Sequence, residues 1–426
     1  MKYNKNILLL YGFNFFKSLQ FFGALVVPFY LYRAGLDYTR MFLLETIFSV
    51  GMFVLEIPTG VVADRLGRKI SLFFGSCFFG IGFLLFGFFT SYPILIIAEV
   101  ICAIGMTLLS GADRAILYEI LKESHQEEKA DTVMARYDAF GTAGMFLAFP
   151  AGTLFAGSHL VAYKSALGLV FVATAIAIGI SGLILLWVKE GSYEKSPESA
   201  IRQGLNGFLY IFHQPRLRAF SFNFAFISSL TFFMFWFYQS LLLENKFPVA
   251  WQGFIASGFN LTAILLLSLT PFLKRRLGMK NTLFFTSVIP GVLYLSVSLI
   301  PGIIMTLIAI FGVTNLKMFR APMLNALIND EIESSSRATV LSGVSMLERV
   351  FTAFLYPIVG ALTDISLRVT FLTLGMITII LSIILRVGED SIKGDSVKKI
   401  QAGKTSPVNS KLPLGTGKRR IGWWVI

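Results

Sequence analysis

The chain has 426 residues, of which 55% are hydrophobic and only 14% are charged, and its mean hydropathy is +0.72. Soluble domains carry about 25% charged residues, so this composition excludes a soluble globular protein and predicts a membrane protein. The formal net charge of +13 is accounted for below by the loops and needs no nucleic-acid partner. Two cysteines, Cys77 and Cys102, lie in apolar runs and cannot form a disulfide framework.

The N-terminal stretch MKYNKNILLLYG is basic and then apolar, as in a signal peptide. We reject that reading because the apolar run continues to about Tyr32 without a small-residue cleavage site, and many equal runs follow. A helix needs about 20 apolar residues to cross the hydrocarbon core. The predicted spans are 7–32, 41–62, 70–90, 93–120, 132–156, 165–187, 217–243, 251–273, 280–300, 302–329, 339–363 and 367–387.

These runs do not alternate polar and apolar residues, as the strands of a membrane barrel do. Helices are the remaining way to cross a bilayer, because each helix satisfies its own backbone hydrogen bonds. The predicted fold class is therefore an all-α membrane protein with twelve transmembrane helices.

Lysine and arginine are distributed unevenly between the two sets of loops. If the N-terminus is cytoplasmic, the inner segments carry 27 of the 37 cations, the outer loops carry 5, and the other 5 lie within spans. This bias predicts a multi-pass protein of the cell membrane with both termini in the cytoplasm. It also explains most of the net positive charge.

The longest internal polar stretch follows six spans and precedes six. We predict an N-terminal six-helix bundle (1–187), a cytoplasmic linker (188–216), a C-terminal six-helix bundle (217–387) and a basic, disordered cytoplasmic tail (388–426). The halves also carry matching stretches: RAILYEILKESHQEEKADTV and RAPMLNALINDEIESSSRATV both begin with Arg-Ala and end with Thr-Val. Two pseudo-symmetric halves are typical of secondary transporters, which bind substrate between the halves near the midplane.

The stretch GVVADRLGRK (60–69) lies between the second and third predicted spans. It resembles the loop signature of the major facilitator superfamily, Gly-x-x-x-Asp-Arg/Lys-x-Gly-Arg-Arg/Lys, at every fixed position. The resemblance covers roughly residues 1–390 and implies two six-helix halves that work by alternating access. The stretches EIPTG (56–60), SGADRAILYE (110–119) and SRATVLS (336–342) are similar to a bacterial subgroup of drug or multidrug efflux permeases.

The resemblance also implies a gating role for this loop, through Gly60, Asp64, Arg65, Gly67, Arg68 and Lys69. Gly60 is expected to allow close helix approach and Gly67 a tight turn. Asp64 is expected to meet the N-terminus of the eleventh span near Arg337, where the helix dipole favours an anion. Arg68 is expected to reach the inner end of the fourth span, with Glu119 as its first choice of partner. These contacts would lock the inner gate.

Ionisable side chains within spans are costly, so each marks a functional site or a paired structural charge. Helical spacing in the eleventh span places its polar residues on one face, which predicts that they line a central cavity. The candidates for proton coupling or the cavity are Glu348, Asp113, Asp138 and Glu99. The candidates for the substrate cavity are Lys17, Asn14, Lys317, Arg349, Ser345, Thr352, Trp236 and Gln239. Permanent ion pairing and plain aromatic packing are the alternatives.

The leading functional prediction is proton-coupled export of hydrophobic drug-like compounds. An excess of cations near the midplane, and the departure of GTAGMFLAFPAG (141–152) from the antiporter signature, keep open uptake or exchange of a small anionic metabolite. A membrane-embedded transferase is the remote alternative, because the three histidines lack metal-ligand spacing and no phosphate-binding loop is present. The expected partners are a small-molecule substrate, protons and lipid, with no cofactor, metal or nucleic acid, and with a monomeric chain.

Overall fold

The protein is all-helical in the computed structural model, which describes residues 5–190, 200–332 and 337–386. Eleven of its helices are long and apolar enough to cross a membrane within these described residues, so the predicted fold class is confirmed. The helices are α1 Lys5–Lys17, α2 Val26–Pro28, α3 Tyr38–Leu66, α4 Arg68–Phe88, α5 Tyr92–Leu109, α6 Ala112–Glu123, α7 Ala130–Gly157, α8 Tyr163–Ile184, α9 Ala200–His213, α10 Pro215–Glu244, α11 Val249–Ser268, α12 Thr270–Leu299, α13 Ile303–Asp330, α14 Arg337–Ile365 and α15 Leu367–Ile384.

The first predicted span is not one continuous helix. It consists of α1, a non-helical stretch, the short α2 and a π-helical turn, Phe29–Arg33. The side chain of Gln239 on α10 replaces helical hydrogen bonds at this break. Its amide nitrogen donates to the carbonyl of Gly23 at 3.2 Å, and its amide oxygen accepts from the N–H of Val27 at 3.0 Å. A broken helix is tolerated within a membrane protein when neighbouring groups satisfy its freed backbone in this way.

Two glycines allow sharp turns, one in each half of the chain. Gly67 separates α3 from α4 with φ 101° and ψ 153°, and Gly278 kinks α12 with φ 75° and ψ 163°. Both values lie in a region that side chains with a Cβ rarely adopt. The turn predicted at Gly67 is therefore a single residue, and α3 continues through Gly60 as far as Leu66.

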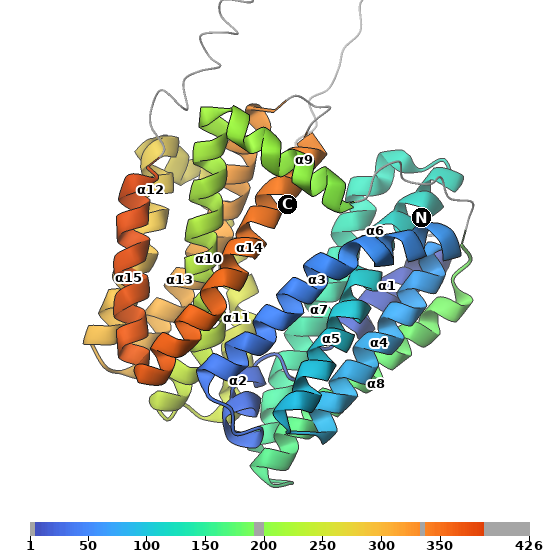
Figure 1. Cartoon of the computed structure of the whole chain (residues 1–426), viewed down its shortest axis with the longest axis horizontal. Helices are drawn as coiled ribbons and strands as arrows, with labels where there is room; N and C mark the ends of the chain where they lie inside the picture. Colours follow the sequence, from blue (N-terminus) through green and yellow to red (C-terminus); the bar gives the residue numbers. More distant parts are fainter. Residues whose placement is uncertain (1–4, 191–199, 333–336, 387–426) are drawn as a thin grey trace, which may run out of the picture. The chain divides into compact units, whose positions relative to one another are not determined.

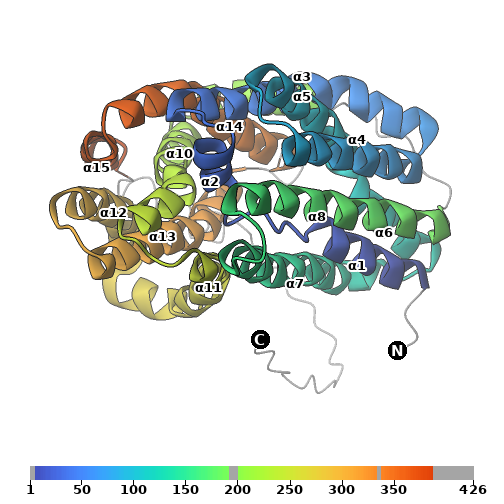
Figure 2. The same ribbon diagram turned by 90° about the horizontal axis from the view of Figure 1, so that it is seen from below.

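Helices α1–α8 and α10–α15 form two bundles joined along two seams. In the first bundle α4 packs against α5 and α8, and in the second α12 packs against α13 and α15. The seams are α3 with α14 and α7 with α11, which lie on opposite edges in Figure 2. A Cβ on Gly253 of α11 would lie 2.2 Å from the carbonyl oxygen of Phe149 on α7. Small residues therefore let these two helices approach closely.

The two bundles are tied together at one end of the helices, which we call the closed end. The carboxylate of Asp364 at the end of α14 accepts hydrogen bonds from the N–H groups of Tyr38 and Thr39, at 2.8 and 2.9 Å. The Tyr38 hydroxyl also donates to Ser240 on α10 at 2.8 Å. Asp364 thus occupies the N-terminus of α3, where four backbone N–H groups lack helical partners.

The opposite end, which we call the open end, has no comparable ties. Among described residues we find no hydrogen bond or ion pair that joins the two bundles there. In Figure 1, α3 and α14 diverge from their lower ends upward. Helix α9 packs along the open-end part of α14, where Gly207 and Gly343 allow backbone contact.

Candidate functional site

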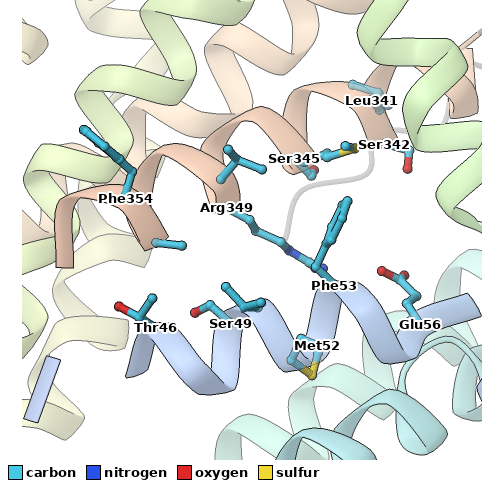
Figure 3. A pocket seen from close by; sticks show the side chains of 14 residues that line it. Thr46, Ser49, Met52, Phe53, Glu56, Leu341, Ser342, Ser345, Arg349 and Phe354 are labelled. Atoms are coloured by element: carbon cyan, nitrogen blue, oxygen red, sulfur yellow. The ribbon is translucent and has the colours of Figure 1, made fainter. Parts of the chain in front are cut away.

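A cavity of about 620 Å³ lies between α3 and α14, in the region where these helices diverge. Its lining residues are Thr46, Ser49, Val50, Met52, Phe53, Glu56, Leu341, Ser342, Ser345, Met346, Arg349, Val350, Ala353 and Phe354. The wall is largely apolar, with hydroxyl groups from both helices and two charged side chains. Figure 3 shows Arg349 reaching from α14 toward α3, and Glu56 pointing from α3 toward α14. Pockets of about 300–1,000 Å³ with apolar walls and a few polar groups suit drug-sized molecules.

Four predicted site residues form a cluster in the first bundle rather than lining this cavity. The Lys17 ammonium lies 2.9 Å from the Asp113 carboxylate, which also accepts a hydrogen bond from the Tyr137 hydroxyl at 2.8 Å. The buried Asn14 amide donates to the carbonyl of Tyr137 at 2.7 Å. Nearby, Asp138 pairs with Arg114 at 2.9 Å. Lys17, one of the cations that made up the predicted midplane excess, is therefore paired with a carboxylate of its own bundle.

Removal of the Asp113 carboxylate should lower stability more than removal of the Asp138 carboxylate does. The side chains of Lys17 and Asp113 are 18% and 13% exposed, whereas those of Arg114 and Asp138 are 60% and 51% exposed. Leaving a buried charge unpaired costs several kcal/mol, roughly 3 here, while an exposed pair contributes about 0–1 kcal/mol. We expect Asp113→Asn to lower the midpoint of thermal unfolding in detergent clearly more than Asp138→Asn does. Equal shifts would show that the buried pair adds no more stability than the exposed pair does.

The eleventh-span polar residues divide between two faces of α14. Ser345 and Arg349 face the cavity, whereas Glu348 lies 4.0 Å from Lys317 on α13. The Lys317 ammonium also sits 4.5 Å from the centre of the Phe232 ring. Thr352 donates a hydrogen bond of 2.7 Å to Ser229 on α10, which fixes that face of α14 against its own bundle.

Trp236 and Gln239 lie at the contact between the bundles, away from the cavity. Trp236 is buried and packs edge-on against Phe42 of α3 and Tyr356 of α14. Gln239 completes the broken first span, as described above. The aromatic stretch on α10 thus packs the region next to the closed end.

Glu99 is a buried acid on α5 with a hydroxyl partner. Its carboxylate accepts a hydrogen bond from the Tyr30 hydroxyl at 2.9 Å, and its side chain has no ion pair among the described residues. Glu45 of α3 is close enough to interact with it electrostatically. An ionised carboxylate buried without a cation is costly, and the Tyr30 hydroxyl offsets part of that cost.

The turn after α3 brings Arg68 and Glu119 together, with 2.6 Å between their charged atoms. Arg65 is exposed, and the Lys69 ammonium donates to the carbonyl of Leu186 at 3.1 Å. A Cβ on Gly60 would meet no atom within 4 Å, so no helix approaches it closely in this conformation. Arg337 is exposed at the start of α14, and the side chain of Asp64 lies outside the described residues.

Three further acids were missed by sequence reasoning. Glu190 accepts hydrogen bonds from the N–H groups of Arg68 and Lys69, at 2.5 and 3.1 Å, and so caps α4. Glu56 lines the cavity, and Asp364 ties the closed end. Of these three acids, only Asp364 lies at a position in the sequence that could have suggested a role. It comes directly after the eleventh predicted span (339–363), as Asp64 comes shortly after the second (41–62).

The sequence profile of the Major Facilitator Superfamily matches residues 7–342, which is more than half of the chain. The chain belongs to the major facilitator superfamily. This membership makes the protein a multi-pass membrane transporter of a small molecule, and it excludes the enzyme alternative. The two divergent bundles are the two halves of the transporter.

Solved structures agree with this fold. The transporter resembles the nucleoside transporter NupG with a TM-score of 0.72 and 16% identity, over 93% of this chain and 100% of NupG. It resembles a POT family transporter in complex with a thioalcohol-conjugated peptide with a TM-score of 0.71 and 13% identity, over 92% and 96% of the two chains. At such low identity these likenesses show the fold alone.

Curated relatives match only in part. The transporter is 32% identical over 83 residues to the uncharacterised MFS-type transporter YxaM of Bacillus subtilis, which is 20% of this chain and 21% of YxaM. It is 27% identical over 128 residues to the quinolone resistance protein NorA of Staphylococcus aureus, covering 30% and 32% of the two chains. The matches thus span about a fifth to a third of these relatives.

Proposed function

We propose that this transporter exports hydrophobic, drug-like compounds in exchange for protons. It would belong to the drug efflux-like transporters, as the partial similarity to the quinolone resistance protein NorA supports. The observation that carries the proposal is the cavity between α3 and α14, whose volume of about 620 Å³ and largely apolar wall suit such a molecule.

The conformation supports a cytoplasmic entry route. The excess of lysine and arginine predicts that the end of the bundles holding the turn at Gly67 faces the cytoplasm. This is the open end of the structure. A substrate would therefore enter the cavity from the cytoplasm or the inner leaflet, and it would leave after the closed end opens.

Proton coupling would rest on the acids within the bundles. Glu348 is our first candidate, because its 4.0 Å separation from Lys317 makes a weak pair that a proton can break. Glu99, buried with the Tyr30 hydroxyl, is the second candidate. Asp113 and Asp138 are held more closely by their cations, both at 2.9 Å, which favours a structural role for them.

The test is transport by the purified protein in proteoliposomes with an imposed pH gradient. We expect accumulation of a permanently charged lipophilic cation, such as a fluorescent quaternary ammonium compound, on the acidic side and against its own gradient, in proteoliposomes but not in protein-free liposomes. Collapse of the pH gradient with an uncoupler should abolish this accumulation. Accumulation that persists after collapse, or none with a range of lipophilic compounds, would contradict the proposal.

Uptake or exchange of a small anionic metabolite is the second candidate. Arg349 favours it, because this exposed cation lines the cavity without an ion pair among the described residues. Two observations weigh against it. Lys17 and Lys317 have carboxylate partners, and Glu56 places a negative charge in the same cavity. Saturable transport of organic anions, with no response to lipophilic amines, would favour this candidate.

A further inference from the structure

Two opposite charges face each other across the cavity without pairing. Glu56 belongs to α3 and Arg349 to α14, and both line the cavity (Figure 3). Neither takes part in an ion pair with any residue that the structure describes. Glu348, the sequence neighbour of Arg349, is directed to Lys317 instead.

This separation contrasts with two close ion pairs elsewhere in the protein. Lys17 pairs with Asp113 at 2.9 Å, and Arg68 pairs with Glu119 at 2.6 Å. Arg349 is exposed and Glu56 is half-buried, so both charges are accessible to a ligand that enters the cavity. A cation and an anion left unpaired on facing walls of one cavity therefore point to a ligand that pairs with each of them.

We propose that the substrates of this cavity are amphipathic compounds with an anionic group at one end and an ammonium group at the other. Arg349 would hold the anionic group and Glu56 the ammonium group. Guanidinium binds carboxylates with two parallel hydrogen bonds, which gives it direction as well as strength. The apolar body of the compound would lie along Phe53, Val350 and Phe354. This inference rests on the proposed export function and adds the charge pattern of its substrate.

Such a substrate also suits the movement that alternating access requires. A compound with both charges would neutralise both walls at once, so the occupied cavity would carry no unpaired charge. Closing a cavity around an unpaired charge is unfavourable because desolvation is not offset. A singly charged compound would leave either Glu56 or Arg349 without a partner as α3 and α14 approach each other.

A different role for the same residues predicts a different result. Glu56 and Arg349 would serve only as a gate if they paired with each other whenever the open end closes. In that case, removal of either charge would affect every substrate to the same degree. A role in recognition instead predicts that each residue affects only the compounds bearing its complementary group.

The test uses four versions of one rigid aromatic probe, 4′-(aminomethyl)biphenyl-4-carboxylic acid. Its methyl ester keeps only the ammonium group, its N-acetyl derivative keeps only the carboxylate, and the doubly blocked compound is neutral. Binding to the purified transporter is measured calorimetrically for each version. We expect the parent compound to bind at least tenfold more tightly than either singly blocked version.

Variants of the transporter test which residue binds each end of the probe. Arg349→Gln should remove the preference for the parent over the ester, and Glu56→Gln should remove the preference for the parent over the N-acetyl compound. Arg349→Lys, which keeps the charge, should retain part of the preference. Arg386→Gln is the matched control, because it removes an exposed arginine outside the cavity. Thermal unfolding confirms that each variant is folded.

Equal binding of all four probes, or equal losses for all probes in both variants, would overturn the inference. Either result would leave proton-driven export of other compounds untouched. Conversely, failure of pH-driven transport would contradict the proposed function, while the charge preference in binding would stand. The two proposals can therefore fail separately.

Discussion

Replacement of Glu348 by glutamine is expected to abolish substrate accumulation driven by a pH gradient. Exchange of labelled for unlabelled substrate at equal pH should continue, because that process needs the substrate site but no net proton movement. We expect uphill transport in proteoliposomes to fall at least tenfold, which corresponds to about 1.4 kcal/mol or more. Exchange should change by less than about threefold, roughly 0.7 kcal/mol.

The reason lies in how Glu348 is placed. It is on the same helix as the cavity residue Arg349, but its carboxylate is directed to Lys317 at 4.0 Å. The two side chains are 26% and 27% exposed, so neither is sealed in the bundle. A proton on Glu348 would break this pair, and glutamine would hold the pair broken at every pH. Movement of α14 would then no longer depend on protons.

Glu331→Gln is the control for this prediction. Glu331 is also a carboxylate of the second bundle, paired with Arg216 at 3.9 Å, but it lies just after α13 and away from the cavity. Its replacement should leave uphill transport unchanged. If Glu348→Gln retained proton-driven accumulation, then Glu348 would not be the coupling residue, and Glu99 would become the first candidate.

Hydropathy alone predicted the fold, because the bilayer imposes helices of a set length on an apolar chain. The break in the first span could not be predicted in this way. It depends on Gln239, whose side chain bonds to the backbone of Val27 from a position 212 residues away. The same residue was predicted in the cavity because a polar group on an aromatic stretch suits a ligand as well as it suits a broken helix.

The pattern of charges was visible in the sequence, but the partners were not. Lys17 and Asp113 lie 96 residues apart, and helical spacing says nothing about which helices meet. Arg68 and Glu119 are an exception, because their contact was anticipated from the resemblance of the turn to its family. The contact joins α4 to α6 within the first bundle and is present while the open end is apart, so it does not hold the two bundles together as the gating role expected. The role of Glu56 was missed because it follows from the angle between α3 and α14, which no local pattern encodes.

Replacement of Asp364 by asparagine is expected to shift the resting transporter away from the conformation with a closed outer end. Asp364 accepts hydrogen bonds from the N–H groups of Tyr38 and Thr39 and from the Thr39 hydroxyl, at 2.8, 2.9 and 2.5 Å. It thus caps α3 from the other bundle, and a carboxylate at a helix N-terminus is favoured by the helix dipole. Asparagine keeps one acceptor oxygen but loses the charge and the second acceptor, and the loss of one hydrogen bond costs about 1 kcal/mol. The ratio of closed to open conformations should therefore fall about fivefold.

Asp37→Ala separates this latch from simple helix stability. Asp37 caps the same helix, but from within its own bundle, by accepting a hydrogen bond from the N–H of Arg40 at 2.7 Å. Its loss should weaken α3 equally in both conformations and leave their ratio unchanged. The ratio can be measured from the distance between spin labels placed at Lys164 and Glu244, near the closed end of each bundle, after Cys77 and Cys102 are replaced by serine.

The family resemblance of the turn predicts a counterpart of this latch at the opposite end of the same two helices. Asp364 ends α14 and caps α3, while Asp64, near the end of α3, is predicted to meet the start of α14 at Arg337 when the open end closes. The carboxylate at the end of each of these two helices would then cap the N-terminus of the other helix. The Asp364 cap would form when the closed end is shut, and the Asp64 cap would form when the open end is shut. Asp64→Asn should accordingly shift the label distances in the direction opposite to Asp364→Asn, with substrate affinity largely retained. Shifts in the same direction would mean that the two acids do not act as alternating latches.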